Sequence, residues 1–123
     1  MNSIIFYENS KGISELWKFL ENLRCKALTN KDARIQYKQI VLYINLLQSN
    51  GTNLPTNIAK HIEDGIWELR PGNNRIFYFC HVDNTYVLLH QFRKKTQKTP
   101  RKEIEQAKAE RNAYLHNKGA DKQ

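Results

Sequence analysis

Cations crowd into one short stretch of this chain. Between Arg93 and Lys102, six of ten residues are lysine or arginine. Like charges this close repel one another, so the stretch favours an anionic ligand such as the phosphate backbone of a nucleic acid. A solvated basic linker is the alternative that charge alone leaves open.

Two further arginines, Arg70 and Arg75, stand on the two sides of a predicted turn, Pro71-Gly-Asn-Asn74. A guanidinium can hold two phosphate oxygens at once, so the pair could stabilise the negative charge that develops in phosphoryl transfer. Glu68 is two residues ahead of Arg70. It could instead pair with either arginine at a sheet edge, a contact worth about 0–1 kcal/mol if exposed.

The groups that could move protons are His90, Lys94 and Lys95. In metal-independent RNA cleavage the 2′-hydroxyl attacks the neighbouring phosphate, so one group must take a proton and another must give one. His90 is the first candidate for the base, with a lysine or Glu68 as alternatives, although a histidine on a sheet is more often structural. Lys95 or Lys94 could protonate the leaving oxygen, because crowded cations make a lysine release its proton more readily.

Size and composition narrow the classes of protein. The chain has 123 residues and a formal net charge of +8, which suits one basic domain with a nucleic acid, an acidic membrane surface or an acidic protein as its partner. No apolar run approaches the roughly 20 residues of a spanning helix. The amino terminus does not resemble a signal peptide. We therefore expect a cytoplasmic protein that is not inserted in a membrane.

The cysteines and histidines do not form a recognisable metal or disulfide pattern. Cys25 and Cys80 are too few for a disulfide framework, and we expect both to be reduced and largely buried. The four histidines lack the spacing and the cysteine or carboxylate company of a zinc site. We expect no structural metal and no cofactor.

Hydrophobic periodicity predicts an α+β domain. A first strand over 3–8 is followed by two amphipathic helices that should form an antiparallel hairpin, a loop, three strands and a last helix capped by Thr99. We expect a small antiparallel sheet with the helical hairpin on one face. The predicted ranges after the first strand are 12–27 and 31–48 for the helices, 52–64 for the loop, 66–70, 74–82 and 85–93 for the strands, 100–117 for the last helix, 1–117 for the single domain, and 118–123 for a disordered tail.

The expected register divides the sheet into two faces. A two-residue loop at Asp83-Asn84 pairs Phe79 with Leu88 and Phe77 with His90. One face is then apolar and packs on the hairpin, and it comprises Trp67, Leu69, Ile76, Tyr78, Cys80, Val87 and Leu89. The other face carries Glu68, Arg70, Arg75, Phe77, Phe79, Leu88, His90 and Phe92. Because burying unpaired charges is costly, we expect a cationic cleft on this second face, with Phe77 and Phe92 as its floor or as stacking platforms.

Several blocks of the sequence resemble a known family. They are Asp64-Gly-Ile-Trp-Glu-Leu-Arg70, Arg75-Ile-Phe-Tyr-Phe79, Val87-Leu-Leu-His-Gln-Phe-Arg-Lys-Lys-Thr-Gln-Lys-Thr-Pro100, Glu103-Ile104 and Ala107. Together they resemble the HigB-like branch of the RelE toxin superfamily, over roughly residues 58–115. The first fifty residues are similar only in their order of strand, helix and helix.

The resemblance implies a fold and a function. It implies a RelE-like toxin fold and the toxin of a type II toxin–antitoxin system, an endoribonuclease that cuts mRNA on the ribosome and inhibits translation. It also implies a HigA-like helix-turn-helix antitoxin, through which the complex binds operator DNA. Arg75 matches the arginine that the superfamily keeps for the scissile phosphate. The cations after Phe92, chiefly Lys94, Lys95 and Lys98, match its phosphate-binding and acid–base positions.

The catalytic set expected from sequence is Arg75, Arg70, His90 and Lys95. RNA contacts are expected from Arg93, Lys94, Lys98, Glu68 and Phe92. Many superfamily members use a tyrosine near the carboxyl terminus, but Tyr114 lies in a predicted helix and cannot be equated with it. Two other functions remain open: a non-catalytic RNA- or ribosome-binding module, and a degenerate toxin retained for antitoxin binding.

Overall fold

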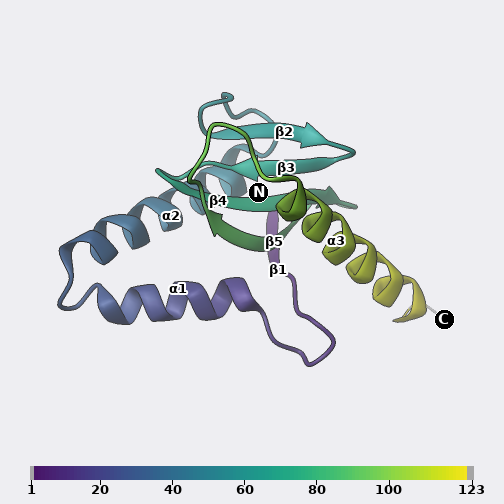
Figure 1. Cartoon of the computed structure of the whole chain (residues 1–123). Helices are drawn as coiled ribbons and strands as arrows, with labels where there is room; N and C mark the ends of the chain where they lie inside the picture. The colour runs from purple at the N-terminus through teal and green to yellow at the C-terminus, as the bar shows by residue number, and fades with distance from the viewer. Residues whose placement is uncertain (1, 122–123) are drawn as a thin grey trace.

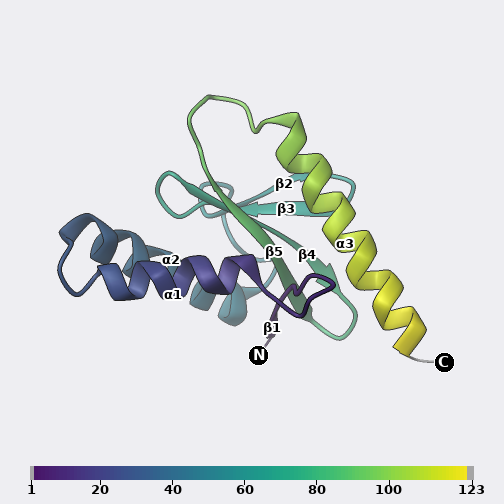
Figure 2. The same cartoon turned by 60° about the horizontal axis from the view of Figure 1, so that its bottom comes forward.

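The computed structural model describes residues 2–121, and the side chains of residues 2–117. Figures 1 and 2 show one sheet with a helical hairpin on one side and a long carboxyl-terminal helix on the other. This arrangement confirms the predicted α+β class. The elements in the described range are β1 (Ser3–Phe6), α1 (Glu15–Lys26), α2 (Lys31–Asn50), β2 (Ala59–Glu63), β3 (Ile66–Leu69), β4 (Asn74–His81), β5 (Thr85–Arg93) and α3 (Arg101–Asp121).

The five described strands form one sheet in the order β1-β5-β4-β3-β2. Strands β3 to β5 are an antiparallel meander, as expected, and β2 extends it. Strand β1 pairs with β5 in parallel, so the sheet is mixed. A parallel neighbour needs a long crossover connection. Along the chain, the whole helical hairpin comes between β1 and the other strands, and it supplies that length.

Strand β2 was predicted as part of a loop, and this prediction is wrong. Its five residues pair with β3, and the register shifts between His61 and Glu63. The segment reads Ala-Lys-His-Ile-Glu, which has little apolar alternation. Charged residues and an irregular register are common on edge strands, where they discourage pairing with another chain. The pattern that marks a buried strand is therefore missing from this one.

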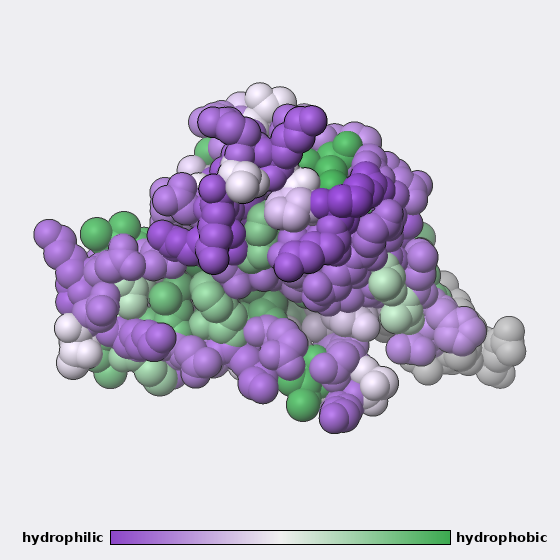
Figure 3. All heavy atoms as spheres, viewed as in Figure 1, coloured by the Kyte–Doolittle hydropathy of each residue, from purple (hydrophilic) through white to green (hydrophobic). Residues whose placement is uncertain are grey.

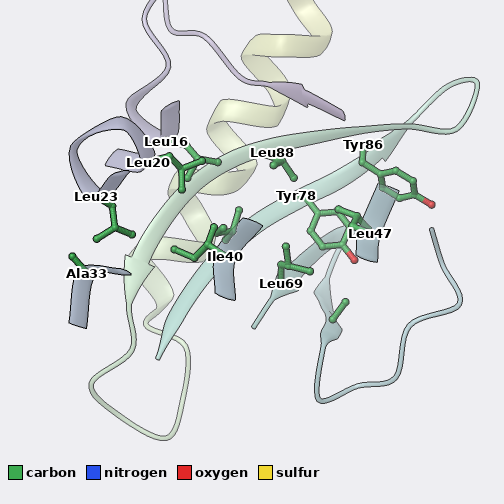
Figure 4. Packing of buried hydrophobic residues seen from close by; sticks show 12 residues of the cluster. Leu16, Leu20, Leu23, Ala33, Ile40, Leu47, Leu69, Tyr78, Tyr86 and Leu88 are labelled. Atoms are coloured by element: carbon green, nitrogen blue, oxygen red, sulfur yellow. The ribbon is translucent and has the colours of Figure 1, made fainter. Parts of the chain in front are cut away.

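Both helices of the hairpin are capped at their amino termini. The side chain of Ser14 accepts a hydrogen bond from the backbone N–H of Trp17 at 3.0 Å, and that of Asn30 accepts one from Ala33 at 2.9 Å. Both helices turn an apolar stripe toward the sheet, as Figure 4 shows for the labelled side chains. The buried residues of this first core are Leu16, Leu20, Leu23, Ala33, Ile40, Leu47, Ala59, Leu69, Ile76, Tyr78, Tyr86 and Leu88.

Helix α3 covers the opposite face of the sheet (Figure 2). It contributes Ile104 and Ala107 to a second core, and Tyr114 packs at the edge of that core. The strand residues of this second core are Ile66, Phe77, Phe79, Val87, Leu89 and Phe92. One sheet with a core on each face explains how so short a chain buries nearly all of β4 and β5.

The register of β5 differs from the predicted one. His81 pairs with Thr85, so the β4–β5 loop has three residues, and Asp83 and Asn84 both take a positive φ. Phe79 therefore pairs with Val87. Val87 and Leu89 lie on the α3 face and Leu88 lies on the hairpin face, opposite to the prediction. A one-residue change in a turn moves every following side chain to the other face.

A bulge corrects this shift before the end of β5. The pairing passes from Tyr78–Leu88 to Ile76–Gln91, so β5 uses one more residue than β4. Arg75 then pairs with Phe92, as predicted. Because of the bulge, the consecutive residues Leu89 and His90 both face α3, where one joins the core and the other meets helix carboxylates.

Three smaller predictions can be compared with the structure. Cys25 and Cys80 are free thiols, but both are exposed, so their predicted burial is wrong. Over residues 2–121, none of the helices has the length and apolarity needed to cross a membrane. Helix α3 is described as far as Asp121. The disordered tail expected from 118 stays a prediction, and residues 122–123 lie outside the described range.

Candidate anion-binding site

A surface hollow of about 410 Å³ opens where the β3–β4 turn meets the loop between β5 and α3. The backbone N–H of Lys94 donates to the carbonyl of Asn73 at 2.7 Å, which joins the two segments. The lining residues are Asn73, Arg75, Lys94, Lys95, Thr96 and Gln97. Three of these six are cations and none is acidic, so the hollow attracts anions.

The surface around this part of the molecule is polar. Figure 3, drawn from the same side as Figure 1, shows hydrophilic side chains gathered over the sheet and over the loop that leads into α3. Apolar surface is visible instead between α1 and α2. The candidate site is thus a charged surface depression, and it differs from the apolar pockets that hold most small-molecule ligands.

Arg75 is the buried cation of the hollow, with a side chain only 9% exposed. Its Nη1 donates to the carbonyls of Gly72 at 2.7 Å and of Asn74 at 2.9 Å, which fixes the plane of the guanidinium. Burial lowers the pKa of this guanidinium, and the charge of Glu68 opposes that effect. Nε lies near Glu68 but is buried without a hydrogen bond, and Nη2 makes no hydrogen bond within the described side chains, so the Nη2 edge is left to meet a ligand.

Glu68 is the counterion of this arginine. It is 2% exposed, and its Oε1 lies 3.5 Å from Nε of Arg70 and 3.6 Å from Nε of Arg75. Its Oε2 accepts a hydrogen bond from the hydroxyl of Thr99 at 2.8 Å. The exposed edge pair considered from sequence is therefore a buried cluster. Thr99, expected to cap the last helix, uses its hydroxyl to tie the end of the basic loop to the sheet.

Arg70 joins this cluster but is not among the residues that line the hollow. Its Nη1 donates to the carbonyl of Thr56 at 3.1 Å, in the loop before β2. The structure therefore brings Arg70 and Arg75 to the same carboxylate, as the register predicted, but only Arg75 reaches the hollow.

His90 lies between two carboxylates of α3. Its Nδ1 is 2.6 Å from Oε1 of Glu110, and its Nε2 is 3.0 Å from Oε1 of Glu103. A neutral imidazole has only one N–H, so two carboxylates at these distances favour the protonated ring. Burial by itself would lower the pKa of His90, but Glu110 and Glu103 outweigh it and raise that pKa. This environment disfavours the role of general base, and His90 does not line the hollow.

The remaining predicted residues fall in four places. Arg93 is exposed and does not line the hollow, and its Nη1 donates to Oε1 of Gln36 in α2 at 2.8 Å. Lys94 and Lys95 line the hollow, the first half-buried and the second exposed. Lys98 is exposed further along the loop, where the hydroxyl of Thr96 donates to its carbonyl at 2.8 Å. Phe92 is 9% exposed and stacks on Phe77 at 5.4 Å between ring centroids, inside the core under α3.

Sequence reasoning missed some residues that take part in the site. Thr96 and Gln97 stand inside the basic run, and Asn73 stands in the predicted turn, so their positions were a usable signal. The side chains of Asn74 and Gln91 also hydrogen-bond each other at 2.9 Å, on the face of the sheet that meets α2. That pair gave no signal, because the two residues are 17 positions apart in the chain.

Comparison with known proteins assigns the family. The family model described as phage-derived protein Gp49-like matches residues 26–112, which include every residue of the hollow. No curated protein matches the chain. A toxin-like family of this kind implies an antitoxin partner. The chain belongs to the phage-derived Gp49-like family, which is a RelE/HigB-like toxin family.

Proposed function

We propose that this chain is the ribonuclease toxin of a type II toxin–antitoxin pair, in the HigB-like branch. In this proposal it works in the cytoplasm, cuts mRNA on the ribosome and thereby stops translation. Its partner is a HigA-like helix-turn-helix antitoxin, through which the complex reaches operator DNA. The observation that carries the proposal is the convergence of Arg75, Lys94 and Lys95 on one hollow in a chain of a toxin family.

The reaction that suits this hollow is attack of an RNA 2′-hydroxyl on its own 3′-phosphate. A bond forms between O2′ and phosphorus, and the bond between phosphorus and O5′ of the next nucleotide breaks. One proton leaves O2′ and one is delivered to O5′, so the products are a 2′,3′-cyclic phosphate and a 5′-hydroxyl. The protein must move these protons and stabilise the additional negative charge of the transition state.

We assign these tasks to the residues that line the hollow. Arg75 is held by two backbone carbonyls and by Glu68, so its free Nη2 edge can meet a non-bridging phosphate oxygen with little reorganisation. Lys95 is exposed on the loop, and we assign it to protonate O5′. Lys94, half-buried beside Asn73, is then the side chain that accepts the proton from O2′, a step that requires its neutral amine form.

One observation favours a second candidate function, a non-catalytic RNA- or ribosome-binding module. His90 is committed to Glu103 and Glu110, so the hollow has cations but no imidazole that could act as base. A binding module would lose affinity in small steps as each lysine is removed, with a strong dependence on salt and no strand scission. A degenerate toxin would bind its antitoxin but would not arrest growth.

Inducible expression in bacteria, with mapping of mRNA ends, tests the proposal. We expect growth arrest and new 5′-hydroxyl ends inside reading frames from the wild-type chain. Both should be lost with Arg75→Ala and kept with Arg34→Ala, because Arg34 is an exposed arginine of α2. Since Arg75 is buried, a folded double variant Lys94→Ala/Lys95→Ala serves as the second test. Normal growth with intact messages from folded wild-type protein would reject the ribonuclease and favour the binding module.

A further inference from the structure

A polar network joins α2 to the ends of β4 and β5, on the face of the sheet opposite Arg75. Gln36 is its centre: its Oε1 accepts hydrogen bonds from Asn74 at 3.0 Å and from Nη1 of Arg93 at 2.8 Å. The Nε2 of Gln36 donates to Asp32 at 2.6 Å. Asn74 is 2% exposed, and its Oδ1 accepts from Gln91 at 2.9 Å. The amide of Gln36 is therefore held at both ends.

Arg93 is fixed by this network, but no carboxylate of the described side chains, residues 2–117, forms an ion pair with it. Most arginines in the described part of the chain have a carboxylate within 4.0 Å, namely Arg24, Arg70, Arg75, Arg101 and Arg111. Arg34 and Arg93 have none, and of these two only Arg93 is held by a side chain, the neutral amide of Gln36. An exposed guanidinium that is already ordered and still uncompensated can bind an anion at a low entropic cost.

The position of Arg93 relates it to the hollow. Asn74 pairs with Arg93 and Arg75 pairs with Phe92, so the two arginines are one register step apart. Successive side chains of a strand point to opposite faces, so Arg75 lies on the α3 face and Arg93 lies on the α2 face at the same end of the sheet. Lys94, which follows Arg93 directly, lines the hollow. The cations therefore continue around the end of the sheet.

We infer that Arg93 is a second phosphate site, and that Gln36 is the positioning residue that holds it there. An RNA strand has a phosphate at every nucleotide, so a strand with one phosphate in the hollow can place a neighbouring phosphate on Arg93. The ligand is then single-stranded RNA that bends around the end of the sheet, because a stacked duplex cannot follow so sharp a path. The inference rests on the proposed function in taking RNA as the ligand of the hollow.

Equilibrium binding of a labelled single-stranded RNA oligonucleotide to the full chain, over a series of salt concentrations, tests this inference. Arg93→Gln should weaken binding about tenfold, the loss expected for one charge-assisted contact. It should also reduce the salt slope by roughly 0.7, the value for one phosphate of a single strand. Arg34→Gln removes the same charge from an unfixed side chain of α2 and should leave both quantities nearly unchanged.

Variants of Gln36 separate positioning from charge. Gln36→Glu keeps an oxygen acceptor for Asn74 and Arg93, loses the N–H donor to Asp32 and gives Arg93 a counterion. It should therefore weaken binding and lower the salt slope as Arg93→Gln does. Gln36→Ala leaves Arg93 charged but mobile, so affinity should fall while the salt slope stays. Combined with Arg93→Gln, neither substitution should weaken binding further. Thermal unfolding of each variant confirms that it is folded.

The outcomes distinguish this inference from the proposed function. Wild-type affinity and slope in folded Arg93→Gln and Gln36→Glu proteins would overturn the second site, even if the chain cleaves RNA. The expected losses in a chain that leaves growth normal and messages intact in bacteria would support the site and reject the ribonuclease. A folded wild-type chain that binds no single-stranded RNA would overturn the second site, and the mRNA ends mapped in bacteria would still decide the ribonuclease.

Discussion

The Nε atom of Arg75 lies 3.6 Å from Oε1 of Glu68, and both side chains are buried at the end of the sheet. The arginine that lines the hollow therefore has its counterion built into the fold. Thr99 holds the other oxygen of the same carboxylate. A single buried carboxylate thus connects the strand that supplies Arg75 with the loop that supplies the lysines.

The first prediction concerns the stability that Glu68 provides. Glu68→Gln should lower the free energy of unfolding by about 3 kcal/mol, because it leaves a buried guanidinium without a charged partner. The control is Glu105→Gln, which breaks an exposed pair with Arg101 and should cost about 0–1 kcal/mol. Denaturant unfolding measures both. Equal losses in the two variants would show that the buried cluster has no special role in stability.

The second prediction concerns pH. The pKa of His90 is raised in the folded protein, so its contribution to stability is fully present below its ordinary value of 6.5 and is lost as pH rises through the raised value. Carboxylates of Glu103 and Glu110 face the ring, and the ring of Phe77 lies 5.2 Å away. Urea unfolding at a series of pH values above 6 should show this loss in the wild type. His90→Gln should remove that part of the pH dependence. If the variant shows the same pH dependence of stability as the wild type, the ion pairs of His90 with Glu103 and Glu110 are contradicted.

The third prediction concerns proton transfer. Lys95→Met should slow RNA cleavage by about 10²-fold or more, the usual contribution of a general acid. Lys102→Met is the matched control, since Lys102 is an exposed lysine of α3 that does not line the hollow. Cleavage rates on translating ribosomes measure the difference. Comparable rates in the two variants would exclude Lys95 as the donor to O5′.

The fourth prediction concerns the end of α2. Gly51 has φ 57°, and a Cβ there would come 2.8 Å from the hydroxyl of Tyr86 and 2.9 Å from the amide of Asn2. Gly12 also has a positive φ, 75°, but a Cβ there would meet nothing within 4 Å. Gly12→Ala should cost about 1 kcal/mol of left-handed strain. Gly51→Ala should cost more, because β1 or Tyr86 must also move. Thermal unfolding of the two variants measures both costs, and an equal or smaller cost at Gly51 would contradict this prediction.

Local sequence patterns were sufficient for much of the fold. The stripes of α1 and α2 and the three strands β3 to β5 follow from periodicity and turn residues close in the chain. Strand β2 was missed because an edge strand buries little and needs no apolar alternation. The parallel pairing of β1 with β5 has no local signal, since it joins segments about eighty residues apart.

The candidate site was predicted in part. The basic run and the turn indicated that Arg75, Lys94 and Lys95 would meet, because both segments flank paired strands. The role expected for His90 was drawn from its residue type and from its place in the predicted register. Its real surroundings come from α3, whose Glu103 and Glu110 are 13 and 20 residues further along the chain.

By itself the sequence determined the α+β class, the helical hairpin and the concentration of cations after β5, because these depend on residue type and short-range spacing. Only the tertiary structure decided which charges are compensated. A three-residue loop and a bulge set the register of β5, and packing then gave Glu68 to Arg75 and two carboxylates to His90. Packing also placed Arg93 beside the neutral amide of Gln36. Such pairings depend on distances between elements remote in the chain, and spacing along the sequence does not contain them.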